Sequence, residues 1–251
     1  MPAYNEQQRL PATLDSVFCH LHSASYSGEI VVVDDGSSDG TVGAVETLAG
    51  AHPELRLIRN PHRGKAFTVR TGILASRGQH ALFMDADGAT HVSEVDKLLA
   101  LLEQGYDVAI GSREGLGAQR FDEPSYRHLM GRVFNLVVRT LAVPGIQDTQ
   151  CGFKAFRHQA AQALFSNLQL YAKDTGPVEG AVVTAFDVEI LFLARKWGYA
   201  IAEVPVHWRY GEESKVNPLK DSWRNFRDVI RVRWNDLRGR YPNHPPTSSP
   251  H

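Results

Sequence analysis

The sequence contains little cysteine. Cys19 and Cys151 are the only two cysteines among 251 residues, and their spacing matches no metal-binding pattern. This scarcity argues against a disulfide-rich secreted domain and is typical of a reducing compartment. We interpret both thiols as small apolar residues of the core.

Long apolar runs and a charge bias are also missing. No run approaches the roughly 18 apolar residues that a membrane-spanning helix needs, and no signal peptide is visible. The net charge of -1 excludes a general polyanion-binding protein. With 43% hydrophobic and 22% charged residues, the chain has an ordinary globular composition and the length of one α/β domain. We therefore expect a cytoplasmic protein.

Strand and helix patterns alternate along the chain. β-branched or apolar runs predict strands over residues 29–33, 55–58, 80–84, 107–110 and 201–206. Apolar residues at helical spacing predict helices over residues 6–21, 41–48, 65–76, 92–102, 125–141, 186–197 and 221–237. Residues 148–157 form a compact polar-then-apolar segment, and 171–184 an inserted loop. The alternation predicts a mostly parallel, doubly wound sheet, which binds ligands beyond the carboxyl ends of its strands.

The first residues lack a strand pattern. Pro2-Ala3-Tyr4-Asn5 is typical of a loop, and it leads directly into the helix predicted from Glu6. An α/β domain normally begins with a strand. We therefore expect the first strand of the sheet to be truncated, or to be encoded upstream of Met1.

Two aspartates follow the buried strand at residues 80–84. Asp85 and Asp87 stand two residues apart, so both carboxylates can turn toward one ion. Oxygen ligands suit Mg²⁺ or Mn²⁺, which usually complete their shells with water and substrate phosphates. Taken alone, the pair would more simply open a turn before Gly88.

Two further polar clusters lie at predicted strand or helix ends. Asp35 follows the strand at residues 29–33, where a carboxylate can accept hydrogen bonds from a ribose or a base. The plainer interpretation of this segment is an Asx turn, with Ser38 or Asp39 capping the next helix. Gly64-Lys65 begins a helix, and a helix N-terminus with a lysine attracts phosphate. The spacing is not that of a P-loop.

Together these segments resemble the family 2 glycosyltransferases, which have the GT-A fold. The matching segments, in order, are residues 2–6, 32–41, 64–72 and 85–88, with the sequences Pro-Ala-Tyr-Asn-Glu, Val-Val-Asp-Asp-Gly-Ser-Ser-Asp-Gly-Thr, Gly-Lys followed by Val-Arg-Thr-Gly, and Asp-Ala-Asp-Gly. Residues 85–90, 148–154, 186–189 and 203–206 are similar to the dolichyl-phosphate β-glucosyltransferase branch. The resemblance implies one Rossmann-like GT-A domain over residues 1–241 with a truncated first strand.

The resemblance also implies roles for matching residues on the donor side. Asp85 and Asp87 would bind the metal and the diphosphate, with Lys65 near the base or diphosphate. The nucleoside would be held by Pro2, Ala3, Tyr4, Glu6, Asp35 and Gly36. Gly152 and Phe153 would shape the sugar pocket, although Phe153 is also a good candidate for plain core.

On the acceptor side, the resemblance implies that Arg113 and Arg127 receive a phosphate, a task that suits the forked donors of arginine. Arg127 is alternatively a solvated charge on a helix face. Arg209, Ser214 and Lys215 are similar to a mobile loop that closes over the phosphates. Glu189 joins Asp87, Arg113 and Arg127 as a catalytic candidate, or it orients a neighbouring arginine.

The predicted helix at residues 220–240 is basic and amphipathic. Its apolar residues recur at helical spacing: Trp223, Phe226, Ile230, Trp234 and Leu237. Seven Lys or Arg against three Asp give the helix a charge of +4. Such a helix can lie in a membrane interface, or its stripe can pack on the domain. No RNA-binding module accompanies it, so we expect no nucleic-acid partner. Residues 242–251 are expected to be a disordered tail.

These features predict an inverting hexosyltransferase, peripheral on the inner face of a membrane, that moves glucose from UDP-glucose to a polyprenyl or dolichyl phosphate. A lipid phosphate is already ionised near neutral pH, so it needs no catalytic base, whereas a hydroxyl acceptor would need one, with Asp148 and Glu189 as candidates. GDP-mannose as donor, a sugar nucleotidyltransferase and an inactive membrane-binding module stay open as alternatives.

Overall fold

The computed structural model describes residues 1–121, 136, 138–170, 186–209 and 218–245. The strands are β1 (Pro2–Ala3), β2 (Ile30–Asp34), β3 (Leu55–Arg59), β4 (His80–Met84), β5 (Val108–Ser112), β6 (Gln119–Phe121), β7 (Phe153–Arg157), β8 (Ile201–Pro205) and β9 (His207–Arg209). The helices are α1 (Leu10–Ser23), α2 (Thr41–Ala51), α3 (Lys65–Ala75), the short 3₁₀ helix η1 (Val92–Glu94), α4 (Val95–Glu103), α6 (His158–Ser166), α7 (Phe186–Lys196) and α8 (Pro218–Leu237). The predicted α/β class is confirmed.

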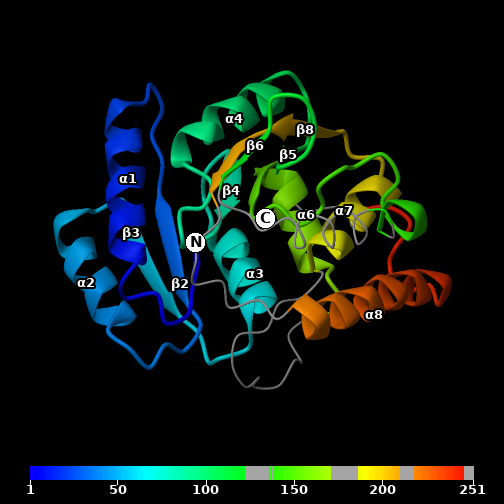
Figure 1. Cartoon of the computed structure of the whole chain (residues 1–251), viewed down its shortest axis with the longest axis horizontal. Helices are drawn as coiled ribbons and strands as arrows, with labels where there is room; N and C mark the ends of the chain where they lie inside the picture. Colours follow the sequence, from blue (N-terminus) through cyan, green and yellow to red (C-terminus); the bar gives the residue numbers. More distant parts are fainter. Residues whose placement is uncertain (122–135, 137, 171–185, 210–217, 246–251) are drawn as a thin grey trace.

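The strands form two main sheets. One is parallel with the order β1-β2-β3, and the other is mixed with the order β4-β7-β5-β8. A third sheet pairs β6 with β9 in parallel. Figure 1 shows α1 and α2 beside β2 and β3, with α6, α7 and α8 at the other end of the molecule. Helix α3 lies between them and packs against both β2 and β4, so it joins the two halves.

The start of the chain differs in part from the prediction. Pro2 and Ala3 form a two-residue strand rather than a loop, paired in parallel with Val33 and Asp34 of β2. Helix α1 begins at Leu10, four residues later than predicted. Residues 5–7 are instead bound to the loop before α2 and to its first residue, Thr41, whose Oγ1 accepts from Glu6 N at 2.9 Å.

Strand β7 was not predicted. Phe153–Arg157 runs antiparallel between β4 and β5, with Phe153, Ala155 and Phe156 wholly buried. A lysine in the middle of the run, Lys154, hides the strand pattern in the sequence. The strand matters for the site because it places residues 150–153 beside the carboxyl end of β4.

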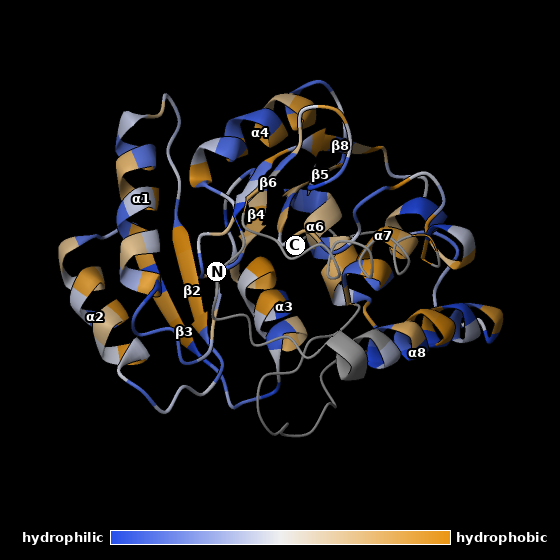
Figure 2. Ribbon diagram, viewed as in Figure 1, coloured by the Kyte–Doolittle hydropathy of each residue, from blue (hydrophilic) through white to orange (hydrophobic). Residues whose placement is uncertain are grey.

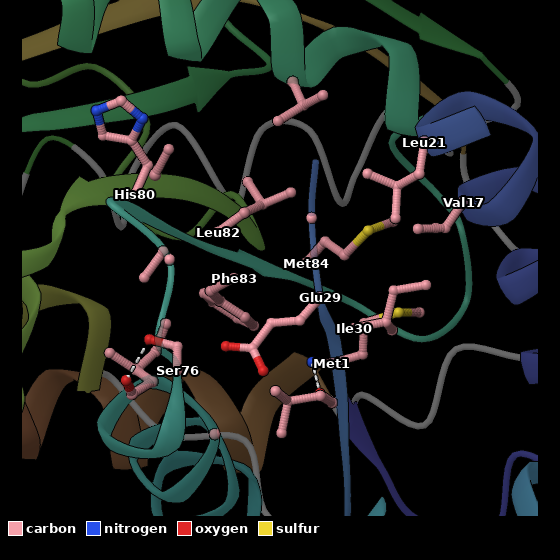
Figure 3. Close-up of a pocket in the computed structure, with 18 of the residues that line it drawn as sticks. Met1, Val17, Leu21, Glu29, Ile30, Ser76, His80, Leu82, Phe83 and Met84 are labelled. Carbon is pink, nitrogen blue, oxygen red and sulfur yellow. Dashed lines mark hydrogen bonds between the residues drawn. The ribbon is translucent and has the colours of Figure 1, made fainter. Parts of the chain in front are cut away.

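A cavity of about 820 Å³ separates the two main sheets. Figure 3 shows it between Ile30 of β2 and Leu82 and Met84 of β4, with Val17 and Leu21 of α1 on one side. Among the described residues β2 and β4 do not pair, and β1 covers only the last two residues of β2. The described strands of the predicted sheet therefore form two separate main sheets.

Helix α8 carries its apolar stripe outward. Trp223, Ile230, Trp234 and Leu237 are 70, 48, 53 and 75% exposed, whereas Val229 and Val232 are wholly buried. These valines belong to the apolar cluster that contains α7. In Figure 2 the helix alternates between apolar and polar bands. The alternative in which the stripe packs on the domain is therefore wrong.

Three smaller expectations can also be compared with the structure. No helix in the described ranges is long and apolar enough to cross a membrane. Cys151 is buried as expected, but Cys19 is exposed on α1, so its interpretation as a core residue is wrong. Of the predicted disordered tail, residues 242–245 are described, and Pro242 O accepts a hydrogen bond from Trp197 Nε1 at 2.8 Å.

Candidate functional site

The polar clusters predicted at strand ends lie along one edge of the fold. Asp35 directly follows β2, Asp85 follows β4 and Arg113 follows β5, each at the carboxyl end of its strand. In an α/β sheet this is the edge where ligands bind.

Asp85 is held against the backbone of Gly152. A Cβ built on Gly152 would lie only 2.1 Å from Asp85 Oδ2, so no other residue fits there without moving the carboxylate. Asp85 Oδ1 is buried and makes no hydrogen bond of good geometry. Its close contact is an ion pair with Lys65 Nζ at 2.6 Å. The Lys65 ammonium compensates the charge of this buried oxygen, so a cation is already bound at this carboxylate.

Asp87 sits in a tight turn beside α1. Its Oδ1 accepts a hydrogen bond from Ala89 N at 3.0 Å. Thr13 of α1 anchors the turn by donating to Ala86 O at 2.9 Å. Desolvation and repulsion by the Asp85 carboxylate raise the pKa of Asp87, although Lys65 and Arg9 attract its charged form. Burial is the largest cause of this pKa shift, and the repulsion by Asp85 shows that the two carboxylates lie close enough to share a divalent cation.

Lys65 begins α3 and faces the carboxylates. It follows Gly64, whose φ of +90° is a conformation that other residues rarely adopt. Burial alone would lower the pKa of Lys65, but attraction by Asp85, and by Asp187 and Asp87, outweighs burial and raises the pKa. Lys65 is therefore a permanent cation beside the two aspartates, as a phosphate-binding role requires.

A second ion pair lies deeper in the protein. Lys154 of β7 and Asp187 of α7 are both buried, with Lys154 Nζ 2.5 Å from Asp187 Oδ1. Lys154 Nζ also donates to Cys151 O, which fixes the turn containing Gly152. Burial raises the pKa of Asp187, while Lys154 and Lys65 oppose that shift. The sequence placed both residues in family-like segments without assigning them a function.

Asp35 organises the loop before α3. Its buried carboxylate accepts hydrogen bonds from Arg63 N, Gly64 N and His62 Nδ1, each at 2.9 Å. The Asx turn expected here is made by its neighbour Asp34, which accepts from Gly36 N and Ser37 N at 3.1 Å. The predicted nucleoside contact of Asp35 remains a prediction.

The other predicted nucleoside residues lie next to this loop. The Tyr4 ring stacks on His62 with centroids 4.1 Å apart and planes 8° apart. Glu6 forms a two-point ion pair with Arg9. Pro2 and Ala3 lie in β1, and Gly36 turns at a φ of +75° beside His62. The structure thus gathers the predicted set and adds His62 and Arg9, which no sequence pattern singled out.

Arg113 is committed to a buried partner. Its Nε and Nη2 donate to the two oxygens of Asp148 at 2.7 and 2.9 Å, and its backbone N donates at 2.9 Å. Burial by itself would raise the pKa of Asp148, but the Arg113 guanidinium lowers it to about 2. Trp208 flanks the guanidinium, with a ring centroid 5.3 Å away. A phosphate at Arg113 would therefore add to this contact rather than find a lone arginine.

Glu189 and Phe153 are packed into the protein. The Glu189 carboxylate accepts from Tyr241 Oη at 2.7 Å, Gln169 N at 2.6 Å and Leu170 N at 3.1 Å. It is wholly buried, and no arginine is among its described partners. Phe153 is also wholly buried, so only its backbone can face a ligand. The plainer interpretation, a core residue, fits Phe153 better than a pocket-shaping side chain.

The remaining predicted site residues divide into two groups. Arg209 ends β9, and its backbone N donates to Ala89 O at 2.8 Å, which places it next to the Asp87 turn. Arg127, Ser214 and Lys215 lie outside the described residues, as does the loop predicted at residues 171–184.

The residues present fit a divalent cation at Asp85 and Asp87. The observations are a glycine that leaves room for the Asp85 carboxylate, an Asp85 oxygen whose described partner is itself a cation, and a second carboxylate, Asp87, whose pKa is raised by burial and by Asp85. All the available ligands are oxygens, which suit Mg²⁺ or Mn²⁺.

The family model for glycosyl transferase family 2 matches residues 1–165. A dolichyl-phosphate beta-glucosyltransferase of Dictyostelium discoideum is 37% identical over 253 residues, covering 95% of this chain and 74% of the relative. A human protein of the same name is 34% identical over 260 residues, covering 95 and 75%. The chain belongs to glycosyl transferase family 2.

Solved structures share the fold. Glucosyl-3-phosphoglycerate synthase from Mycobacterium tuberculosis, in complex with Mn²⁺, UDP-glucose and phosphoglyceric acid, matches with a TM-score of 0.63 and 18% identity over 98% of this chain and 79% of that one. A mannosyltransferase from Pyrobaculum calidifontis, in complex with GDP-mannose and Mn²⁺, matches with a TM-score of 0.59 and 20% identity, covering 94 and 62%. The predicted GT-A fold is confirmed.

The buried pair gives a stability prediction. Lys154→Met leaves the Asp187 carboxylate buried without its partner and should lower the free energy of unfolding by about 3–5 kcal/mol. The double variant Lys154→Met/Asp187→Leu removes both charges and should regain most of this loss. Urea denaturation measures both. Arg59→Met, which breaks an exposed contact of 3.9 Å with Glu46, should cost less than about 1 kcal/mol. A double variant as unstable as the single one would contradict the prediction.

Glu189 gives a pH prediction. Burial raises its pKa from 4.5 to about 7, although Tyr241 and the two backbone N–H groups favour the charged form. Between pH 4.5 and 7 the folded state therefore holds a proton that the unfolded state has lost, so stability falls as pH rises through this window. The loss should approach roughly 3 kcal/mol above pH 7. Glu189→Gln should remove this pH dependence in thermal unfolding, whereas Glu46→Gln, at an exposed site, should leave it unchanged.

Proposed function

We propose that the protein transfers glucose from UDP-glucose to a dolichyl or other polyprenyl phosphate, with inversion at the anomeric carbon. The observation that carries the proposal is the cluster of Asp85, Asp87 and Lys65 at the carboxyl edge, in a chain similar over most of its length to dolichyl-phosphate beta-glucosyltransferases. Mg²⁺ or Mn²⁺ held by the two aspartates is part of the proposal. GDP-mannose is the alternative donor.

The chemistry needs charge stabilisation at the leaving group. A phosphate oxygen of the lipid forms a bond to the anomeric carbon, and the bond from that carbon to the diphosphate oxygen breaks, so the nucleoside diphosphate leaves with an added negative charge. When bound, a divalent cation supplies electrostatic stabilisation of this charge. Lys65 contributes a fixed cation from the start of α3, and Asp85 holds it in position at 2.6 Å.

The two carboxylates that are candidates for a catalytic base are already hydrogen-bonded within the protein, which favours a phosphate acceptor over a hydroxyl. A hydroxyl would need a general base, for which the sequence offers Asp148 and Glu189 as candidates. Asp148 is bound on both oxygens by Arg113, with a pKa of about 2, and Glu189 is buried among Tyr241 and backbone N–H groups. Neither is placed as a base. An acceptor that is already ionised removes this requirement.

The outward stripe of α8 supports a membrane-bound acceptor. Trp223, Ile230, Trp234 and Leu237 are exposed, and arginines such as Arg238, whose guanidinium lies 4.6 Å from the Trp234 ring centroid, surround them. Tryptophan and arginine together suit the headgroup region of an anionic bilayer. We therefore propose that α8 lies on the membrane surface that carries the lipid phosphate.

Activity tests the proposed reaction. With Mn²⁺, a short polyprenyl phosphate and a panel of UDP-glucose, GDP-mannose and UDP-N-acetylglucosamine, mass spectrometry should find a glucosyl lipid phosphate and UDP. Asp87→Asn should lower turnover by at least about 100-fold, because one anchor of the cation is lost. Gly152→Ala should also lower it, because the new Cβ displaces the Asp85 carboxylate.

The matched control for this assay is Asp15→Asn, the same change at an exposed position of α1, which should keep wild-type turnover. Absence of product with every lipid phosphate would contradict the proposed acceptor. Full turnover in EDTA would contradict the role of the cation. GDP-mannose as the preferred donor would establish the alternative.

Membrane docking is tested separately. Trp223→Glu and Trp234→Glu should each reduce co-sedimentation with vesicles containing anionic lipid by about 10-fold, because a charge replaces an anchoring ring. Trp223→Phe, which keeps an apolar ring, should retain most of the binding. Raising the salt concentration should weaken the wild type, since arginines provide part of the attraction. Equal binding by all variants would show that α8 does not dock.

A further inference from the structure

A group of two histidines and one glutamate lies at the opposite edge of the first sheet. His22 is in the last turn of α1, His52 caps the end of α2, and Glu54 immediately precedes β3. This is the amino end of β3, whereas Asp35 and Asp85 follow carboxyl ends of strands. The group therefore belongs to none of the machinery described above.

The three side chains converge on one point. His22 Nε2 lies 3.2 Å from Glu54 Oε1, and His52 Nδ1 lies 3.3 Å from the same oxygen. The ligand atoms of all three residues lie within 4.8 Å of one another. Bonds of about 2.0–2.1 Å in a tetrahedral site place neighbouring ligand atoms about 3.4 Å apart. Two of the three separations, at 3.2 and 3.3 Å, are already close to this value.

Two of the three ligands, His52 and Glu54, are also held in place before any ion arrives. The His52 ring stacks on Phe18 with centroids 3.6 Å apart and planes 3° apart. The turn that carries the ligands is closed by Leu55 N donating to His52 O at 3.0 Å, and Glu54 O accepts from Ile30 N at 2.8 Å. Little ordering is therefore required on binding, which favours affinity.

We propose that His22, His52 and Glu54 form a second metal site, specific for Zn²⁺ or a similar borderline transition metal. Two imidazole nitrogens and one carboxylate oxygen are a ligand set that zinc accepts with a fourth position for water, and they disfavour Mg²⁺. The side chain of His22 is 65% exposed, so an ion can reach the site from solvent. A bound ion would join the ends of α1 and α2 to the start of β3 and stabilise this corner of the fold.

Without a metal, the same distances describe two histidine–carboxylate hydrogen bonds, so the experiment must separate the two states. Zn²⁺ binding is measured by calorimetry in excess Mg²⁺, which occupies the oxygen site at Asp85 and Asp87 but competes poorly for imidazole. We expect one Zn²⁺ per chain and a rise of several degrees in the unfolding temperature. Co²⁺ should give the visible absorption of a tetrahedral complex.

Variants give the decisive comparison. His22→Gln and Glu54→Gln should each weaken Zn²⁺ binding by at least 10-fold and abolish both the thermal shift and the Co²⁺ absorption. His244→Gln, an exposed histidine elsewhere, should behave like the wild type. Equal Zn²⁺ affinity in all four proteins, or no Zn²⁺ binding by the wild type, would overturn the proposal. Neither result bears on glycosyl transfer, because the two sites share no residue.

Discussion

The ion pair between Lys65 and Asp85 connects the two halves of the fold at their functional edge. β2 and β4 share no pairing among the described residues, and a cavity lies between them. Across this gap the first residue of α3 contacts the residue that follows β4, at 2.6 Å. The preceding residue, Gly64, donates its N–H to Asp35 at the end of β2. The loop after β2 and the carboxylates after β4 therefore keep a fixed spacing.

From Asp85 the same line of contacts continues into the core. Its carboxylate packs on Gly152, the neighbouring Cys151 carbonyl accepts a hydrogen bond from Lys154, and Lys154 pairs with Asp187. Aspartate and lysine alternate along this line, so most of the charges compensate one another. Asp87 is the exception, since its nearest described contact is a backbone N–H and its pKa is raised. The Asp85 and Asp87 carboxylates thus lie close together at the point where a cation would bind.

The sequence predicted the elements whose signal is local. The strands at β2 and β4, the helix beginning at Lys65 and the three strand-end clusters were all placed, because apolar runs followed by Asp or Gly-Lys are visible in a short window. β7 was missed because Lys154 interrupts its apolar pattern, and only the partner Asp187, distant in sequence, makes that lysine tolerable. The same limit applies to Arg113, Glu189 and Phe153. Their partners or burial depend on how distant segments pack, which no local pattern reports.

The exposed apolar stripe of α8 and the hydrogen-bonded carboxylates of Asp148 and Glu189 both support the proposed lipid-phosphate acceptor. Helix α8 buries Val229 and Val232 together with Asn225 and Asp228, and it also exposes a second apolar row that includes Trp223 and Trp234, which a surface helix usually hides. Such exposure is costly in water unless another apolar phase covers it. The proposed acceptor, carried in a bilayer, would supply that phase, and its phosphate would bring the negative charge that a base would otherwise have to create. The absence of a well-placed base among the described candidates and the exposed tryptophans therefore both support the proposed acceptor, a lipid phosphate.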